Sequence, residues 1–154
     1  MEKQGPQNDC PAIELLLVED SPSDVFLTKE ALKAVKRSVN LSVVTDGVEA
    51  MAFLRRQGNY AKSPQPHLIL LDLNIPRKDG REVLAEIKGD NRLKSIPVIV
   101  LTSSSADQDL RMAYELHANC YLVKPATFAE FKEIFERLEA FWFNTVTLPA
   151  HEYF

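Results

Sequence analysis

The middle of the chain reads Leu68-Ile69-Leu70-Leu71-Asp72-Leu73-Asn74, four large apolar residues that run without interruption into an acid. A short apolar run between Pro66 and Pro76 indicates a strand buried on both faces, as in parallel sheets that helices cover. Asp72 then lies at the carboxyl end of this strand, where open α/β sheets bind their ligands. A single acid in such a position is more often a turn cap than a functional group, so the rest of the chain must decide its role.

Length, charge and cysteine content exclude several classes of protein. The 154 residues suffice for one domain with a hydrophobic core, and the net charge of −4 gives no basic surface for nucleic acid. Cys10 and Cys120 have no metal-ligand spacing, so we expect neither a disulfide nor a zinc site. No apolar run reaches the roughly 18 residues of a membrane span, and the N-terminus does not resemble a signal peptide. We therefore expect a cytoplasmic protein that binds neither DNA nor membranes.

Strand and helix patterns alternate along the chain. Besides 68–71, strands are predicted over 13–18, 41–44, 97–101 and 120–123, and a helical pattern follows each strand. Ser21 and Pro22 are typical of a helix start, and Thr127 with Glu130 forms a capping box before the last helix. Five strand–helix repeats predict an α/β fold, in which a five-stranded parallel sheet carries helices on both faces.

Polar residues gather where four of the five predicted strands end, namely Glu19-Asp20, Asp72, Thr102 and Lys124. Parallel strands end at one edge of the sheet, so these side chains should lie together there. Neighbouring carboxylates repel one another unless a cation joins them, and oxygen ligands without His or Cys suit Mg²⁺. Lys124 and Thr102 can contact phosphoryl oxygens, which leaves Asp72 as a nucleophile.

Each of these residues also has a simpler explanation when it is taken alone. Glu19 and Asp20 can stabilise a helix N-terminus, Thr102 can bond to the backbone and Lys124 can be solvated. Tyr121, three residues before Lys124, can likewise belong to the core. His67, His117 and His151 match no ligand or base position, and we expect them to be structural or solvated. The combination at successive strand ends is what favours a phosphoryl-transfer site.

The combined motifs resemble the receiver domain of two-component response regulators, over about residues 13–138. The resemblance implies the flavodoxin-like (βα)5 fold, with Asp72 accepting a phosphoryl group from a phosphohistidine of a histidine kinase. It implies that Mg²⁺ is held by Glu19, Asp20, Asp72 and the backbone carbonyl of Asn74, and that Thr102 and Lys124 contact the phosphoryl group. Tyr121 matches the aromatic switch position, and the Lys124–Pro125 peptide is expected to be cis, as is usual in such domains.

The end of the chain carries three consecutive aromatic residues, Phe141, Trp142 and Phe143, beyond the helical face that the core needs. These rings either cap the domain or form an apolar patch that pairs with a second subunit; we expect the patch, and hence a homodimer. The sixteen residues after Leu138 are too few for a DNA-binding domain. We expect a flexible tail over residues 1–11, the receiver domain over 12–143 and an extended tail over 144–154.

The aromatic ending, with residues 78–88 and 116–121, resembles the small response regulators of cyanobacterial phytochromes. This resemblance implies a light-regulated histidine kinase as the phosphodonor and dimerisation through the C-terminal helix region. Two alternatives differ in class: a constitutive interaction module with a receiver fold, and a haloacid-dehalogenase-type phosphatase, which would need an acid where Asn74 stands. We expect a phosphoacceptor that is not an enzyme in the turnover sense.

Overall fold

The computed structural model describes residues 11–149 and contains the five predicted strands. They are β1 (Ile13–Val18), β2 (Val39–Val44), β3 (Leu68–Leu71), β4 (Val98–Thr102) and β5 (Cys120–Val123). Each strand is parallel to its neighbours, in the order β2-β1-β3-β4-β5. The predicted parallel α/β sheet is therefore confirmed, and β3 lies at its centre.

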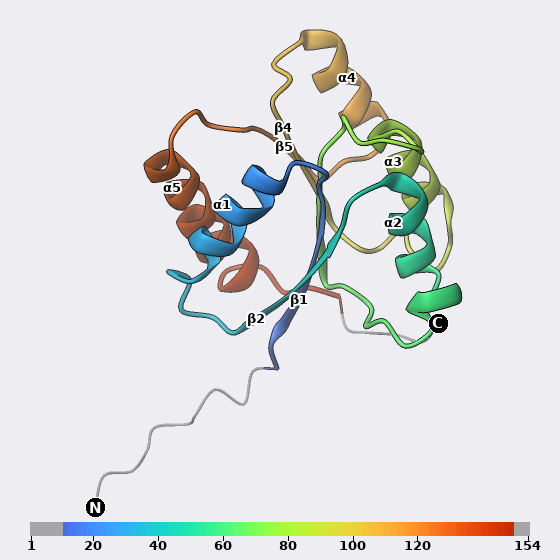
Figure 1. Cartoon of the computed structure of the whole chain (residues 1–154), viewed down its shortest axis with the longest axis horizontal. Coiled ribbons are helices and arrows are strands. Elements are labelled where there is room, and N and C mark those ends of the chain that lie inside the picture. The colour runs from blue at the N-terminus through green and yellow to red at the C-terminus, as the bar shows by residue number, and fades with distance from the viewer. Residues whose placement is uncertain (1–10, 150–154) are drawn as a thin grey trace, which may run out of the picture.

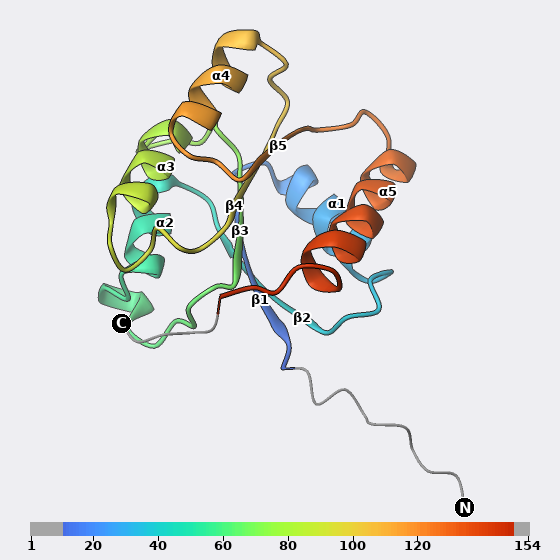
Figure 2. The same cartoon turned by 180° about the vertical axis from the view of Figure 1, so that it is seen from behind.

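Helices cover both faces of this sheet, as Figure 1 and Figure 2 show from opposite sides. They are α1 (Pro22–Leu32), α2 (Gly47–Leu54), α3 (Gly80–Gly89), α4 (Asp107–Glu115) and α5 (Phe128–Leu138). The pair α1 and α5 lies on one face and the pair α2 and α3 on the other, while α4 projects at the top of Figure 1. A short 3-10 helix, η1 (Gly58–Tyr60), and a π-helical segment, η2 (Glu139–Phe143), complete the helices of the described part of the chain.

The central strand β3 shows why its sequence is apolar throughout. Ile69 and Leu71 pack into the hydrophobic cluster under α2 and α3, whereas Leu68 and Leu70 pack into the cluster under α1 and α5. All four side chains are at most 1% exposed. Because helices cover both faces of the sheet, each position of β3 is buried, and a continuous apolar run replaces the usual alternation.

Side-chain caps fix the helix starts at the edge of the sheet where the strands end. The Ser21 hydroxyl accepts a hydrogen bond from the Asp24 N–H, and the Thr127 hydroxyl accepts one from the Glu130 N–H, as the sequence predicted. Asp46 and Asp79 cap α2 and α3 in the same way. These caps satisfy N–H groups that the first turn of a helix leaves unpaired.

Two backbone details differ from the expectations. β2 begins at Val39, two residues earlier than predicted, because its pairing with β1 extends to Ile13. The expectation of a cis Lys124–Pro125 bond is wrong, since the peptide bonds within residues 11–149 are all trans.

Among the described helices, none is long and apolar enough to cross a membrane.

The C-terminal aromatic residues divide between the core and the surface. Phe143 is only 5% exposed and belongs to the cluster under α1 and α5, so its expected place in an exposed patch is wrong. Its carbonyl accepts a hydrogen bond from the Arg37 guanidinium at 3.2 Å. Trp142 is half-buried against the same cluster, whereas Phe141 is 51% exposed. The end of the chain is therefore partly a cap, and only Phe141 presents most of its ring outward.

The start of the predicted extended tail also folds back onto the domain. The N–H groups of Thr145 and Val146 donate to the Phe141 carbonyl, which makes a turn rather than an extended segment. Leu148 then packs against the cluster under α1 and α5. The expected N-terminal tail, apart from Pro11, and residues 150–154 lie outside the described residues.

Candidate functional site

The parallel sheet brings the predicted strand-end residues to one place. Val18 of β1 is in register with Leu71 of β3, so Glu19 and Asp72 leave neighbouring strands side by side. Both carboxylates are buried, with exposed fractions of 2% and 6%. Two buried carboxylates so close together need positively charged or hydrogen-bonding partners.

Three carboxylates of this edge form a group that can hold a cation. One oxygen from each of Glu19, Asp20 and Asp72 lies within 4.8 Å of the other two. Glu19 and Asp72 are buried, whereas Asp20 is exposed, so the group opens to solvent on the Asp20 side. Three carboxylate oxygens with one open side fit Mg²⁺, which binds hard oxygen ligands and retains part of its water shell.

Lys124, at the end of β5, reaches the same acids. Its Nζ atom lies 2.6 Å from Glu19 Oε2 and 2.9 Å from Asp72 Oδ2, which confirms the predicted convergence. A third carboxylate, Asp24 of α1, lies 2.8 Å from the same nitrogen. The sequence motifs did not indicate that Asp24 belongs to this site. The one local signal is its position three residues after the cap Ser21, which places it in the first turn of a helix that starts at this edge.

Burial and pairing shift the pKa values of two of these groups. Burial raises the pKa of Glu19 to about 7, although bonds from Lys124 and from the Ser21 N–H oppose the shift. Burial alone would lower the pKa of Lys124, but its bonds to Asp24, Glu19 and Asp72 outweigh this effect and raise the pKa. Lys124 is therefore a fixed positive charge, while Glu19 is the group whose charge responds to pH and to a bound cation.

Thr102, the last residue of β4, has a hydroxyl group with no partner. The residue is fully buried, and its Oγ1 atom makes no hydrogen bond within the described residues. A buried polar atom without a partner is uncommon and costs free energy. This observation contradicts the simpler explanation that Thr102 bonds to the backbone, and it leaves the hydroxyl available to a ligand.

Tyr121 is connected to the loop that follows Thr102. Its hydroxyl donates to the Ser104 carbonyl at 2.9 Å, and the ring packs partly against the cluster under α2 and α3. The Ser104 hydroxyl in turn donates to Asp109 of α4, which also accepts from Arg81 of α3 at 2.6 Å. The predicted switch residue thus belongs to a chain of contacts from β5 through the loop to α4 and α3.

Two glycines allow the loop after β3 to pass close to its neighbours. A Cβ atom at Gly80 would lie 2.4 Å from the Asp72 carbonyl oxygen, and one at Gly47 would lie 1.9 Å from the Lys78 carbonyl oxygen. The Asn74 N–H, in the same loop, donates to Asp72 Oδ1 at 3.1 Å. Only glycine permits the approach of α3 that supports the backbone of Asp72.

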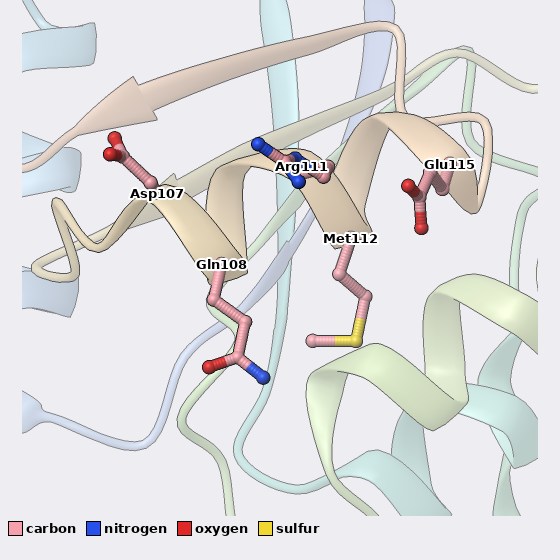
Figure 3. Close-up of a pocket in the computed structure, with 5 residues that line it drawn as sticks. All are labelled: Asp107, Gln108, Arg111, Met112 and Glu115. Carbon is pink, nitrogen blue, oxygen red and sulfur yellow. The ribbon is translucent and has the colours of Figure 1, made fainter.

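The hollow along α4 lies outside this site. Its volume is about 440 Å³, and it is lined by Asp107, Gln108, Arg111, Met112 and Glu115. Figure 3 shows these side chains on α4, with Met112 directed toward the neighbouring helix. The acid group and Lys124 are absent from its lining, so its residues take no part in the chemistry of the strand ends.

Known proteins are similar to this chain in both sequence and structure. The response regulator receiver domain family matches residues 15–136. Response regulator Rcp1 of Synechocystis sp. is 52% identical over 140 residues, which cover 91% of this chain and 95% of that protein. The probable methanogenesis regulatory protein FilR2 of Methanothrix harundinacea is 40% identical over 136 residues, 88% of this chain and 87% of FilR2.

Two solved structures add a metal-bound and a phosphorylated relative. The Mn²⁺-bound form of Rcp1 superposes with a TM-score of 0.85 and covers 90% of this chain and 99% of that one. The phosphorylated cyanobacterial phytochrome response regulator RcpA is 48% identical, with a TM-score of 0.87 over 91% of this chain and all of that one. With the acid group, the strand-end lysine and the matching fold, these findings establish that the chain belongs to the response regulator receiver domain family.

Proposed function

We propose that this chain is the phosphoacceptor of a two-component phosphorelay, in which Asp72 receives a phosphoryl group from a histidine kinase. The observation that carries the proposal is the meeting of Asp72, Lys124 and the unpartnered Thr102 hydroxyl at one edge of the sheet. An acid nucleophile, a positive charge and a free hydrogen-bond donor are the groups that phosphoryl transfer requires. Family membership and the phosphorylated relative RcpA support the same role.

Each residue of the site has a separate role in the proposed phosphoryl transfer. An Asp72 carboxylate oxygen attacks phosphorus while the bond from phosphorus to the kinase histidine breaks, which produces an acyl phosphate. Lys124 and the Thr102 hydroxyl then donate to phosphoryl oxygens, and the Asn74 N–H holds the other Asp72 oxygen. Glu19, Asp20, Asp72 and the Asn74 carbonyl would hold Mg²⁺, which neutralises charge on the transferring group.

The proposed phosphodonor is a phytochrome-type histidine kinase. RcpA is a cyanobacterial phytochrome response regulator, and its 48% identity to this chain supports a kinase of similar kind. Phe26 of α1, the helix that follows Glu19 and Asp20, is 61% exposed and offers apolar surface next to the site. A partner protein can cover such a ring, so the surface suits a transient complex with the kinase. A cytoplasmic location belongs to the same proposal.

We expect phosphorylation of Asp72 to change the position of α4. Ala113 is the one fully buried residue of this helix, whereas Leu110 and Tyr114 are 38% and 49% exposed. A Thr102 hydroxyl that turns toward a phosphoryl group displaces the loop that bonds to Tyr121 and Asp109. Because α4 has few buried contacts, a small displacement of its loop can change its position at low cost.

We also propose a homodimer that uses the edge strand β5 and the C-terminal turn. The apolar groove at this edge is lined by Leu122, Ile134, Leu138, Trp142 and the exposed Phe141, together with polar residues. The other long side of β5 has no strand partner in the described sheet. An unpaired edge next to an exposed aromatic ring favours burial against a second copy of the chain.

Receiver domains are in general not enzymes with turnover, and the site supports this for the present chain. A haloacid-dehalogenase-type phosphatase requires an acid two residues after its nucleophile, and Asn74 stands there. A constitutive interaction module would have no use for a buried threonine hydroxyl without a partner. Both alternatives therefore explain the site less well than a phosphoacceptor.

Intact-protein mass spectrometry after incubation with acetyl phosphate and Mg²⁺ tests the proposal. We expect one phosphoryl adduct on the wild type, none on Asp72→Asn and a normal adduct on Asp107→Asn, which removes an exposed acid of α4. Sedimentation of the same samples with beryllofluoride reports the oligomeric state. An adduct on Asp72→Asn, or no adduct and no beryllofluoride binding in the wild type, would refute the phosphoacceptor role.

A further inference from the structure

We propose that Asp24 is a positioning residue, which holds the Lys124 ammonium group and draws it away from the metal-binding carboxylates when Mg²⁺ binds. The inference rests on the proposed function, because it concerns how the same site accepts its cation. Asp24 does not belong to the group of carboxylates that can share a metal ion. Its only described charged partner is Lys124, at 2.8 Å.

The ammonium group of Lys124 is fully occupied by acids. A lysine ammonium has three N–H donors, and its Nζ lies 2.6 Å from Glu19, 2.8 Å from Asp24 and 2.9 Å from Asp72. The Lys124 side chain is 9% exposed, so solvent cannot easily replace any of these partners. Two of the three acids, Glu19 and Asp72, are also the buried members of the metal-binding group.

Mg²⁺ and Lys124 therefore compete for Glu19 and Asp72. When the ion binds these carboxylates, Lys124 loses much of its attraction to them, and two positive charges in a buried site repel each other. Asp24 offers the one carboxylate that the ion does not need. Lys124 can keep this contact and remain charged within the site, where it can later donate to a phosphoryl oxygen.

The position of Asp24 suits this task because its backbone is fixed while its side chain reaches solvent. Its N–H donates to the hydroxyl of Ser21, the N-cap of α1, and its carbonyl accepts from the Thr28 hydroxyl at 2.9 Å within the helix. The side chain is 27% exposed, in contrast to the 3% of Glu19. The Asp24 carboxylate can thus hold Lys124 from the solvent side of the site, whereas Glu19 lies in its buried part.

Asp24→Asn should weaken Mg²⁺ binding for two reasons that act in the same direction. The variant removes a negative charge near the ion, and it returns Lys124 to Glu19 and Asp72, where it opposes the ion. Removal of an outer residue that supports a metal site typically costs 10- to 100-fold in affinity, and because Asp24 is partly exposed and contacts no metal-binding carboxylate we expect about 10-fold. At saturating Mg²⁺, beryllofluoride should bind the variant no more weakly than the wild type, because Lys124 is then freer to contact the phosphoryl mimic.

A double-mutant cycle with Lys124→Met tests the inference on the full chain. Mg²⁺ affinity is measured by calorimetric titration for the wild type, Asp24→Asn, Lys124→Met and the double variant. We expect the loss of about 10-fold in the wild-type background and a loss below about 2-fold in the Lys124→Met background. Asp24→Glu should recover most of the affinity. Glu30→Gln is the matched control, since it removes one charge from the same helix and contacts Lys33 rather than Lys124.

The outcomes separate the inference from the proposed function. An equal loss in both backgrounds would show that Asp24 acts only through its charge and would overturn a positioning role. Unchanged Mg²⁺ affinity of Asp24→Asn, in a wild type that binds the ion, would overturn the inference and leave the phosphoacceptor role intact. If the wild type binds neither Mg²⁺ nor beryllofluoride, the proposed function fails as well. Weaker beryllofluoride binding by Asp24→Asn at saturating Mg²⁺ would indicate general damage to the site and would also contradict the inference.

Discussion

Replacement of Gly80 by alanine tests how closely α3 supports the acceptor residue. The added Cβ atom would lie 2.4 Å from the Asp72 carbonyl oxygen and 2.5 Å from the Leu73 Cα atom. Both are backbone atoms, so no side-chain rotation can relieve the contact. The start of α3 or the loop after β3 must therefore move by about 1 Å, the difference between 2.4 Å and the 3.4 Å of ordinary contact.

The expected cost follows from the contacts that such a movement disturbs. Overpacking of a closely packed site costs about 1–3 kcal/mol. The hydrogen bond from the Gly80 N–H to the Leu73 carbonyl, 3.0 Å long, contributes about 1 kcal/mol more if it is lost. We expect Gly80→Ala to lower the free energy of unfolding by about 2–4 kcal/mol, and to slow phosphorylation by acetyl phosphate up to about 100-fold through displacement of Asp72.

Gly89→Ala, at the other end of the same helix, is the matched control. A Cβ atom there would meet nothing within 4 Å, so the substitution should stabilise α3 by about 0.5–1 kcal/mol without affecting phosphorylation. Urea denaturation followed by circular dichroism gives the stabilities, and mass spectrometry gives the phosphorylation rates. A Gly80→Ala protein that is as stable and as rapidly phosphorylated as the wild type would refute this account of the close approach.

Three further predictions follow from burial and charge. Phe143→Ala should lower the free energy of unfolding by about 3 kcal/mol because the ring is buried, whereas Phe141→Ala should lower it by less than about 1 kcal/mol and instead weaken the dimer. If both changes destabilised the monomer equally, the two rings would not differ in burial as described. Thr102→Val removes a buried hydroxyl without a partner, so it should raise the free energy of unfolding of the metal-free protein by about 1 kcal/mol and weaken beryllofluoride binding about 10-fold. A lower stability of the variant in urea denaturation would show that the hydroxyl has a partner in the folded protein. Burial raises the pKa of Glu19 to about 7, so protons compete with Mg²⁺ for this carboxylate below that pH. Calorimetric titration should therefore find a Mg²⁺ affinity about 10-fold higher at pH 8 than at pH 6. An affinity that does not change with pH would show that Glu19 is not the titrating ligand.

Local sequence patterns predicted the structure correctly where a residue's burial or hydrogen bonding follows from the strand or helix that contains it. The apolar run before Asp72 predicted a strand covered on both faces, and β3 is buried at each position. Ser21 and Thr127 predicted two helix starts, and both side chains accept the capping hydrogen bond. These features depend on neighbours within a few residues along the chain, so a sequence pattern can specify them.

The acid edge was predictable for a different reason. Parallel strands place their carboxyl ends at one edge of the sheet, so the alternation of strands and helices alone brings Glu19, Asp72, Thr102 and Lys124 together. The same argument could not find Asp24, because the contact of α1 with Lys124 joins residues 100 positions apart in the chain. Nothing in the first turn of a helix reveals which distant side chain its acid will meet.

The parallel α/β fold and its strand-end acids follow from apolar periodicity and from the common direction of the strands, and the resemblance of the strand-end motifs to receiver domains indicated the family. The burial of Phe143 and the exposure of Phe141 depend on how the end of the chain packs, since the aromatic run has no periodicity that separates the two rings. The same is true of the three acids that share Lys124 and of the Thr102 hydroxyl, which has no partner among the described residues. Both are properties of packed side chains from different strands and helices, which become neighbours only when the sheet and its helices assemble.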